Sequence, residues 1–252
     1  MPINYVRRLT GRQRAAQSNR HLGVALAFVA GAANAGGFLA VKQYTSHMTG
    51  IVSAAADNLA LGAIEAAADC AGALLSFLAG AACTALLVNF ARRRQLHSEF
   101  ALPLMLEALL LLAFGVMGAR LQAIDVLVLP AAVMLLCFMM GLQNAVITKL
   151  SRAEIRTTHV TGIVTDLGIE AGKALYWNRD PQAVPRVAAD WGRVAVLSSL
   201  VGAFFVGGVA GALSFSRFGF AATLPLAAIL VGMAIVPIID DLRDRARARA
   251  GA

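Results

Sequence analysis

The sequence has few charged residues. Asp, Glu, Lys and Arg make up 14% of the 252 residues, whereas 59% are hydrophobic and the mean hydropathy is +0.71. A soluble globular domain carries about a quarter charged residues. The charges cluster at the chain ends and in a few connecting stretches, and the windows between them are mainly apolar over about 18 residues or more, enough to cross a bilayer. This pattern excludes a soluble domain and predicts an integral membrane protein.

Cysteine and the common catalytic motifs are also scarce or missing. The three cysteines, Cys70, Cys83 and Cys137, lie in apolar stretches, and their spacing fits neither a metal site nor a disulfide. The sequence contains no Walker loop, no Rossmann fingerprint and no His-Glu-x-x-His pattern. We therefore expect no metal, no cofactor and no ATP-driven transport by this chain, and we do not expect an enzyme.

The apolar windows predict six full membrane spans and two shorter segments. The spans are expected at about 22–42, 68–90, 101–119, 126–148, 193–214 and 219–239. The short segments, 48–64 and 160–176, each begin near a Gly and carry an acid, Asp57 or Asp166. They are too short and too polar for ordinary spans, which favours re-entrant half-helices.

The chain is expected to divide into four parts. A basic arm covers residues 1–20 and a charged tail covers 241–252. Between them, residues 21–120 form what we call the first half and residues 121–240 form the second half. Each half has three full spans and one short segment.

Positive charge predicts the orientation of the chain. If both short segments crossed the membrane, the cluster Arg92, Arg93 and Arg94 would lie outside, against the positive-inside rule. If both are re-entrant, this cluster lies inside with both termini. The net charge of +8 then faces anionic lipid, so lipid and not nucleic acid is the expected partner.

An internal repeat relates the two halves. Residues 45–52 read Thr-Ser-His-Met-Thr-Gly-Ile-Val and residues 157–164 read Thr-Thr-His-Val-Thr-Gly-Ile-Val. Upstream, Asn34 in Gly-Ala-Ala-Asn-Ala is matched by Asn144 in Gly-Leu-Gln-Asn-Ala. Because each half holds an odd number of spans, the second copy must be inverted relative to the first. Many transporters build a site at the axis between such repeats.

The repeated motif predicts a solute site between the two short segments. A half-helix that starts within the membrane directs unsatisfied N–H groups and the positive end of its dipole toward a solute. The candidate substrate-binding residues are His47, Thr49, Gly50, His159, Thr161, Gly162, Asn34 and Asn144.

Each of these side chains also has a structural interpretation. His47 and His159 either ligate solute and relay protons, or bond to a nearby carbonyl and brace a tight loop. Thr49 and Thr161 favour helix caps over ligands. The two asparagines, Asn34 and Asn144, either line the site or hold the short segment in place.

Three carboxylates are candidates for proton coupling: Asp57, Asp166 and Glu107. An acid at membrane depth is costly to bury and marks a functional candidate. The structural alternatives are that Asp166 stabilises the start of its helix and that Asp57 faces water. Glu107 is the most isolated charge in the chain and has no partner in the repeat.

Small residues recur every four positions in several spans, which is typical of close helix packing. The stripes are Ala27-Gly31-Ala35, Gly72-Ser76-Gly80-Thr84 and Gly207-Gly211. They also permit a homo-oligomer.

The sequence resembles the YoaK-like family of bacterial inner-membrane proteins, a family labelled as a domain of unknown function. The resemblance rests on Ala-Asn34-Ala-Gly-Gly-Phe with Ser46-His-Met-Thr-Gly50, and on Gly141-Leu-Gln-Asn144-Ala with Thr158-His-Val-Thr-Gly162 and Thr165-Asp-Leu-Gly168. It implies six spans and an inner-membrane location and names no substrate. Family members often carry Asp at the position of Asn34 and Asn at the position of Ile51, which puts selectivity or coupling in question for this chain.

The sequence thus favours a small-solute transporter or channel, for an anion or weak acid, with proton coupling as an option. The alternatives are a non-transporting membrane scaffold or sensor and, as a weaker option, an intramembrane metal-binding protein or enzyme.

Overall fold

The protein is helical throughout the part of the chain that the structure describes. The computed structural model describes residues 7, 9, 10, 16–120, 125–150, 160–178 and 186–250, and no strand occurs among them. The elements are α2 (Ala16–Val41), α3 (Met48–Ala60), α4 (Ile64–Arg93), α5 (Ala101–Arg120), α6 (Asp125–Leu150), α7 (Val160–Leu175), α8 (Trp191–Phe218), the 3-10 turn η1 (Gly219–Ala222) and α9 (Thr223–Ala250).

Five stretches of helix among these residues are long and apolar enough to cross a membrane. They are Ser18–Val41, Ile64–Arg93, Ala101–Gly118, Leu129–Lys149 and Trp191–Arg247. The last stretch contains both α8 and α9, joined by η1, whose Gly219 has a φ of 57° that favours glycine. The chain is therefore an all-helical, multi-pass membrane protein, as the composition predicts.

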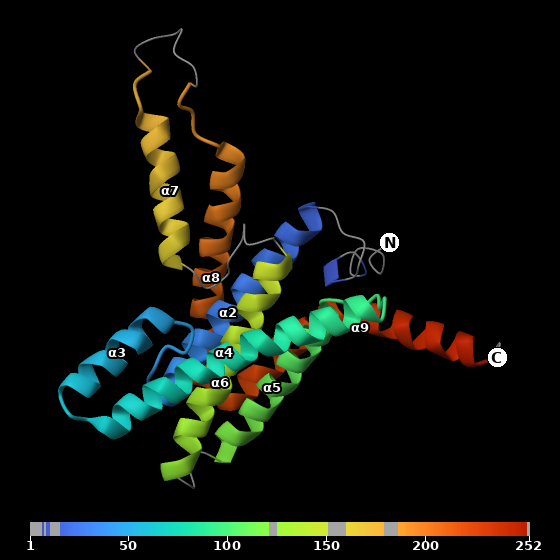
Figure 1. Ribbon diagram of the computed structural model, residues 1–252, viewed down its shortest axis with the longest axis horizontal. Helices are drawn as coiled ribbons and strands as arrows, with labels where there is room; N and C mark the ends of the chain where they lie inside the picture. Colours follow the sequence, from blue (N-terminus) through green and yellow to red (C-terminus); the bar gives the residue numbers. More distant parts are fainter. Residues whose placement is uncertain are drawn as a thin grey trace.

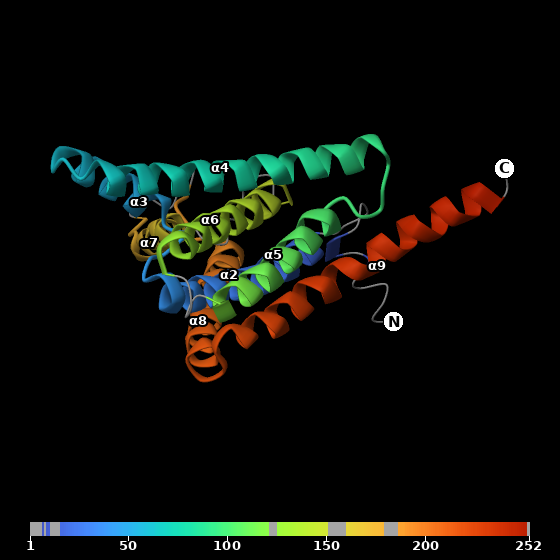
Figure 2. The ribbon, with the colours of Figure 1, turned by 90° about the horizontal axis from the view of Figure 1, so that it is seen from below.

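Three helix pairs form the body of the protein. α2 packs along α8, α4 packs along α6, and α5 packs against α9 (Figures 1 and 2). The first half supplies α2 to α5 and the second half supplies α6 to α9. The first helix of each half therefore packs on the third helix of the other half, and the two fourth helices pack together.

The pair α2 and α8 meets at two Phe-x-x-Gly segments. A Cβ atom added to Gly207 would lie closer than 3.0 Å to the backbone O, C and Cα atoms of Phe28. A Cβ atom added to Gly31 would meet the backbone carbonyl of Phe204 in the same way. The backbones approach so closely that only glycine fits at these two positions.

The pair α4 and α6 meets in the same manner. Gly80 faces the backbone of Phe138, and Gly141 faces the backbone of Phe77. On α4, the hydroxyl of Thr84 donates a hydrogen bond to the carbonyl of Leu142 at 2.9 Å. The small-residue stripes are thus confirmed as packing surfaces, which act in lipid through close contact because lipid tails are as apolar as the side chains.

The short helices α3 and α7 begin at Met48 and Val160, close to the predicted starts. Ile51 of α3 is 3% exposed and packs with Ala73 of α4 and Cys137 of α6. Ile163 of α7 is 5% exposed and packs with Leu197 and Leu200 of α8 and with Ala27 of α2. Figure 1 shows α3 with the start of α4 leaving the body on one side, and α7 with the start of α8 on another.

A polar network holds the end of the molecule where α4, α5 and α9 meet. Asp241 of α9 accepts hydrogen bonds from the backbone N–H groups of His97 and Ser98, at 2.6 and 3.0 Å. Arg7 forms a bidentate ion pair with Asp240, with the shorter contact at 2.6 Å. The connection before α5 and the N-terminal arm are therefore both tied to α9.

Candidate functional site

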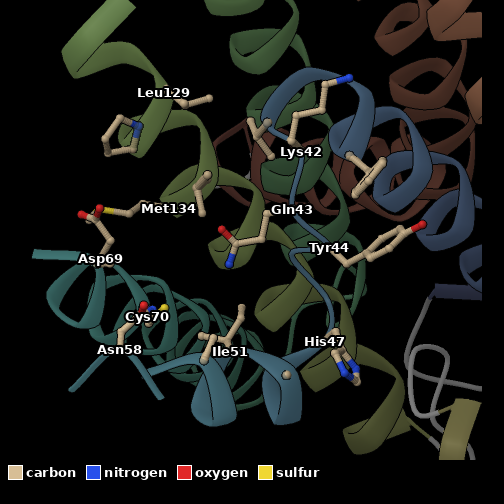
Figure 3. A pocket seen from close by; sticks show the side chains of 17 residues that line it. Lys42, Gln43, Tyr44, His47, Ile51, Asn58, Asp69, Cys70, Leu129 and Met134 are labelled. Atoms are coloured by element: carbon tan, nitrogen blue, oxygen red, sulfur yellow. The ribbon is translucent and has the colours of Figure 1, made fainter. Parts of the chain in front are cut away.

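A cavity of about 570 Å³ opens beside α3. It lies between the connection from α2 to α3, α3 itself, the start of α4 and the start of α6 (Figure 3). Its polar or ionisable lining residues are Lys42, Gln43, Tyr44, His47, Asn58, Asp69 and Cys70, and Ile51, Leu129, Val133 and Met134 supply much of the apolar wall. The cavity thus combines donors, acceptors and a carboxylate with apolar surface.

The connection between α2 and α3 is fixed by three local features. Lys42 has a φ of 56°, so the chain turns sharply where α2 ends. Tyr44 stacks on Phe38 with ring centroids 4.4 Å apart. The side-chain oxygen of Asn34 accepts a hydrogen bond from the backbone N–H of Ser46 at 3.3 Å. Of the two roles expected for Asn34, the structure shows the one that holds the short segment in place.

His47 is the N-cap residue of α3, and its side chain makes no capping hydrogen bond. Its ring lies over Gly50, where a Cβ atom would meet the imidazole carbon and the Nε2 atom. Both His47 and Gly50 line the cavity. The prediction that Thr49 caps the helix is wrong, because the N-cap lies two residues earlier, at His47, and Thr49 is an exposed residue of the first turn of α3.

Six polar or ionisable lining residues were not among the sequence candidates: Lys42, Gln43, Tyr44, Asn58, Asp69 and Cys70. Figure 3 shows the Gln43 side chain reaching from the connection into the cavity, with Asp69 and Cys70 on the facing α4. The only signal in the sequence is that Gln43 lies close to the repeated motif. Asp69 and Cys70 carry no such signal because their place depends on how α4 packs.

The second copy of the motif lies elsewhere. Thr161 and Gly162 are exposed residues in the first turn of α7, and they do not line this cavity. The carbonyl of Thr161 accepts a hydrogen bond from the hydroxyl of Thr165 at 2.9 Å. His159 lies outside the described residues. The structure therefore brings together His47 and Gly50, while a common site for both motifs stays a prediction.

Polar contacts hold α7 against the start of α8. Asp166 forms an ion pair with Arg193 at 2.9 Å. Glu170 accepts hydrogen bonds from Lys173 and from the backbone N–H of Asp190, both at 2.8 Å. These two donors lower the pKa of Glu170, with the Lys173 ammonium as the larger cause.

The other candidate acids lie in contrasting places. Asp57 is exposed on α3 and does not line the cavity. Glu107 of α5 is fully buried, and neither of its carboxylate oxygens has a hydrogen-bond partner. A carboxylate charge in that position would be costly, because no hydrogen bond compensates for the loss of water. Its role in proton coupling stays a prediction.

Of the polar residues of α6, Gln143 contacts α2. Gln143 is fully buried and donates a hydrogen bond from its side-chain nitrogen to the carbonyl of Leu26 at 3.0 Å. Asn144, the counterpart of Asn34, is 7% exposed. Within the described part of the chain, no three His, Cys, Asp or Glu side chains are grouped as metal ligands would be.

The chain matches a family model described as "Protein of unknown function (DUF1275)" over residues 22–236. It therefore belongs to this family, and the resemblance found in the sequence is confirmed. No curated protein and no solved structure matches the chain.

Proposed function

We propose that this member of the DUF1275 family moves a small solute across the membrane, as a transporter or channel, and that the solute enters through the cavity beside α3. The observation that carries the proposal is the cavity itself, a space of about 570 Å³ with polar side chains between the helices of a multi-pass membrane protein. Non-helical backbone and ionisable groups at membrane depth persist where they line a water-filled space.

In the proposed topology, α8 and α9 are separate crossings, which gives six spans together with α2, α4, α5 and α6. Three spans in each half then place the halves in opposite orientations. The exchange of partners between the halves supports this inverted arrangement, because α2 packs on α8 in the way that α6 packs on α4. Such exchange is expected of two repeats related by an axis in the membrane plane.

The proposed orientation follows the positive-inside rule. With α3 and α7 re-entrant, the cluster Arg92, Arg93 and Arg94 lies in the cytoplasm with both termini of a bacterial inner-membrane protein. The cavity lies at the end of α2 and at the starts of α4 and α6. It therefore opens to the outside, and the second motif on α7 lies on the cytoplasmic side.

The proposed solute is a small anion or weak acid. The start of α3 has no side-chain cap, so its first N–H groups remain for water or solute, and the positive end of the helix dipole lies at the cavity wall. Lys42 and His47 add donors on the same side. Asp69, on the facing helix, adds a carboxylate to the lining on the opposite side.

Cys70 offers a native probe of this proposal. We replace Cys83 and Cys137 by Ser, so that Cys70 in the cavity is the only thiol, and reconstitute the protein in liposomes. Flux is measured by stopped-flow light scattering with formate, acetate and nitrate, and with ammonium and methylammonium as cationic comparisons. We expect flux of the anions, and we expect a membrane-impermeant thiol reagent to block it by filling the cavity.

The matched control is the variant that retains only Cys83, which lies on the same helix and does not line the cavity. The reagent should leave its flux unchanged. If none of these solutes moves faster than in protein-free liposomes and none slows the labelling of Cys70, the proposal is overturned in favour of a scaffold or sensor.

A further inference from the structure

Exposed arginines gather at the end of the molecule where α4, α5 and α9 meet. Two lie at the end of α4 and three in the last turns of α9, and together we call them the arginine patch: Arg93, Arg94, Arg243, Arg245 and Arg247. Figure 2 shows the end of α4 and the last turns of α9 on the same side of the molecule. The connection that follows α4 contacts α9 directly, so the two groups of arginines flank one junction.

The acidic side chains at this junction already have partners within the protein. Glu99 is buried and forms an ion pair with Arg92, and Asp244 forms one with His97 at 3.1 Å. Two further aspartates of α9 hold the connection before α5 and the N-terminal arm, as described above. Among the described residues, no ion pair includes a member of the arginine patch. The patch is therefore a surface of positive charge that no ion pair in the described chain neutralises.

Exposed apolar side chains lie beside the patch on both helices. The guanidinium of Arg94 lies over the ring of Phe90, 5.8 Å from its centroid, and Phe90 is 49% exposed near the end of an apolar span. On α9, Leu242 is 58% exposed and directly precedes Arg243. Basic side chains with apolar stems and charged ends occupy the boundary between acyl chains and headgroups in this way. The patch therefore lies at headgroup depth.

We propose that the arginine patch binds the phosphate headgroups of anionic phospholipid in the adjacent leaflet. A guanidinium donates two parallel N–H groups to phosphate oxygens, which matches this headgroup. From Leu242 to Arg247 the helix rises about 7.5 Å, which is about the thickness of one headgroup layer. In the proposed orientation this leaflet is the cytoplasmic one. The proposal does not depend on transport, because the patch is remote from the cavity beside α3.

The choice of a lipid over a soluble anion comes from the apolar neighbours. Phe90 and Leu242 are exposed next to the charges, and acyl chains cover such side chains whereas a soluble phosphate leaves them in water. Lipid bound at the junction would contact both α4 and α9. It would thus link two helices that lie far apart in the sequence.

Native mass spectrometry of the full chain measures the binding. The protein, purified in an uncharged detergent, is titrated with dioctanoyl phosphatidylglycerol and with dioctanoyl phosphatidylcholine, which has the same acyl chains and no net charge. We expect the anionic lipid to bind at least about tenfold more tightly, since each basic residue at a membrane surface contributes about a fivefold factor. Its affinity should fall as the ammonium acetate concentration rises, because exposed charges are screened.

Substitutions in α9 locate the site. The variant with Arg243→Gln, Arg245→Gln and Arg247→Gln should bind the anionic lipid at least about tenfold more weakly. The matched variant with Lys at the same three positions keeps the charge and should retain most of the binding. Arg217→Gln removes an exposed arginine at the opposite end of the α8 and α9 pair and should leave the binding unchanged.

Three results would overturn the proposal: equal affinity for the two lipids, unchanged affinity in the Gln variant, or equal loss in the Gln and Lys variants, which would assign the arginines a structural role. Glycerophosphoglycerol, the same headgroup without acyl chains, should bind weakly. Binding as tight as that of the lipid would identify a site for a soluble phosphate instead, and tighter binding of a short DNA duplex would identify nucleic acid. If the Gln variant fails to elute as a single species, Arg93→Gln with Arg94→Gln makes the same comparison from α4.

Discussion

The close approach of α2 and α8 makes Gly207 the most sensitive position for a small substitution. Gly207→Ala adds one methyl group at the crossing. The added carbon would overlap the carbonyl oxygen of Phe28 and lie 2.8 Å from its carbonyl carbon, whereas ordinary contact begins at 3.4 Å. Because the obstacle is backbone and not a flexible side chain, the two helices must separate by at least about 0.6 Å.

The structure also supplies a matched control for this substitution. Gly202 lies on the same helix, and a Cβ atom there would have nothing within 4 Å. Both substitutions replace Gly by Ala in α8, and each gains about 1 kcal/mol of helix propensity. The difference between the two variants therefore isolates the cost of the crossing.

A radial gap of about 0.5–1 Å forfeits about a quarter to a half of the dispersion energy of each contact. Overpacking of this kind costs about 1–3 kcal/mol. We expect Gly207→Ala to unfold about 2–12 °C below Gly202→Ala, since 1 kcal/mol corresponds to about 2–4 °C for a chain of this size. The assay is thermal unfolding of the detergent-purified variants. Equal melting temperatures would show that α2 and α8 do not meet at these residues.

Two further predictions concern the polar contacts at the helix ends. Asp241→Ala removes the acceptor of the His97 and Ser98 N–H groups, so it should lower the free energy of unfolding by about 1–3 kcal/mol. The control is Asp244→Ala, because the Asp244 side chain is 56% exposed. In the same unfolding assay it should cost less than about 1 kcal/mol. The lowered pKa of Glu170 means that its contacts stabilise the fold above the ordinary pKa of about 4.3 and are lost as pH falls through the folded value. The melting difference between the wild type and Glu170→Gln should therefore be present at pH 7 and shrink at acid pH, and a difference that grows on acidification would contradict the sign of the shift.

The helical fold and the starts of α3 and α7 could be predicted from the sequence, because long apolar windows and a repeated Thr-Gly-Ile-Val carry strong local signals. The close-packing glycines could also be predicted, since their four-residue spacing places them on one face of a helix. The cap of α3 could not be predicted, because a hydroxyl residue near a helix start suggests a cap, whereas the observed N-cap is His47, whose side chain makes no capping hydrogen bond.

Sequence patterns could not predict which residues of α4 line the cavity. Asp69 and Cys70 join His47 because α4 folds back along α3, which is a matter of tertiary packing. A φ of 56° at a lysine has no sequence signal, since this conformation is uncommon for any residue with a Cβ atom. The pairing of Asp166 with Arg193 depends on the register across the connection between α7 and α8, which no local pattern fixes.

Because α2 packs on α8, which belongs to the other half, the order of synthesis affects how the protein assembles. Gly31 of α2 packs against Phe204 of α8, so α2 can meet this partner only after most of the chain has been made. At about 5–20 residues per second, that interval is on the order of ten to thirty seconds. During this interval the glycine-rich face of α2 lacks its α8 partner, and lipid or an insertion chaperone must cover it. A stop codon anywhere before α8 would leave a fragment with an orphan helix, which membrane quality control should remove.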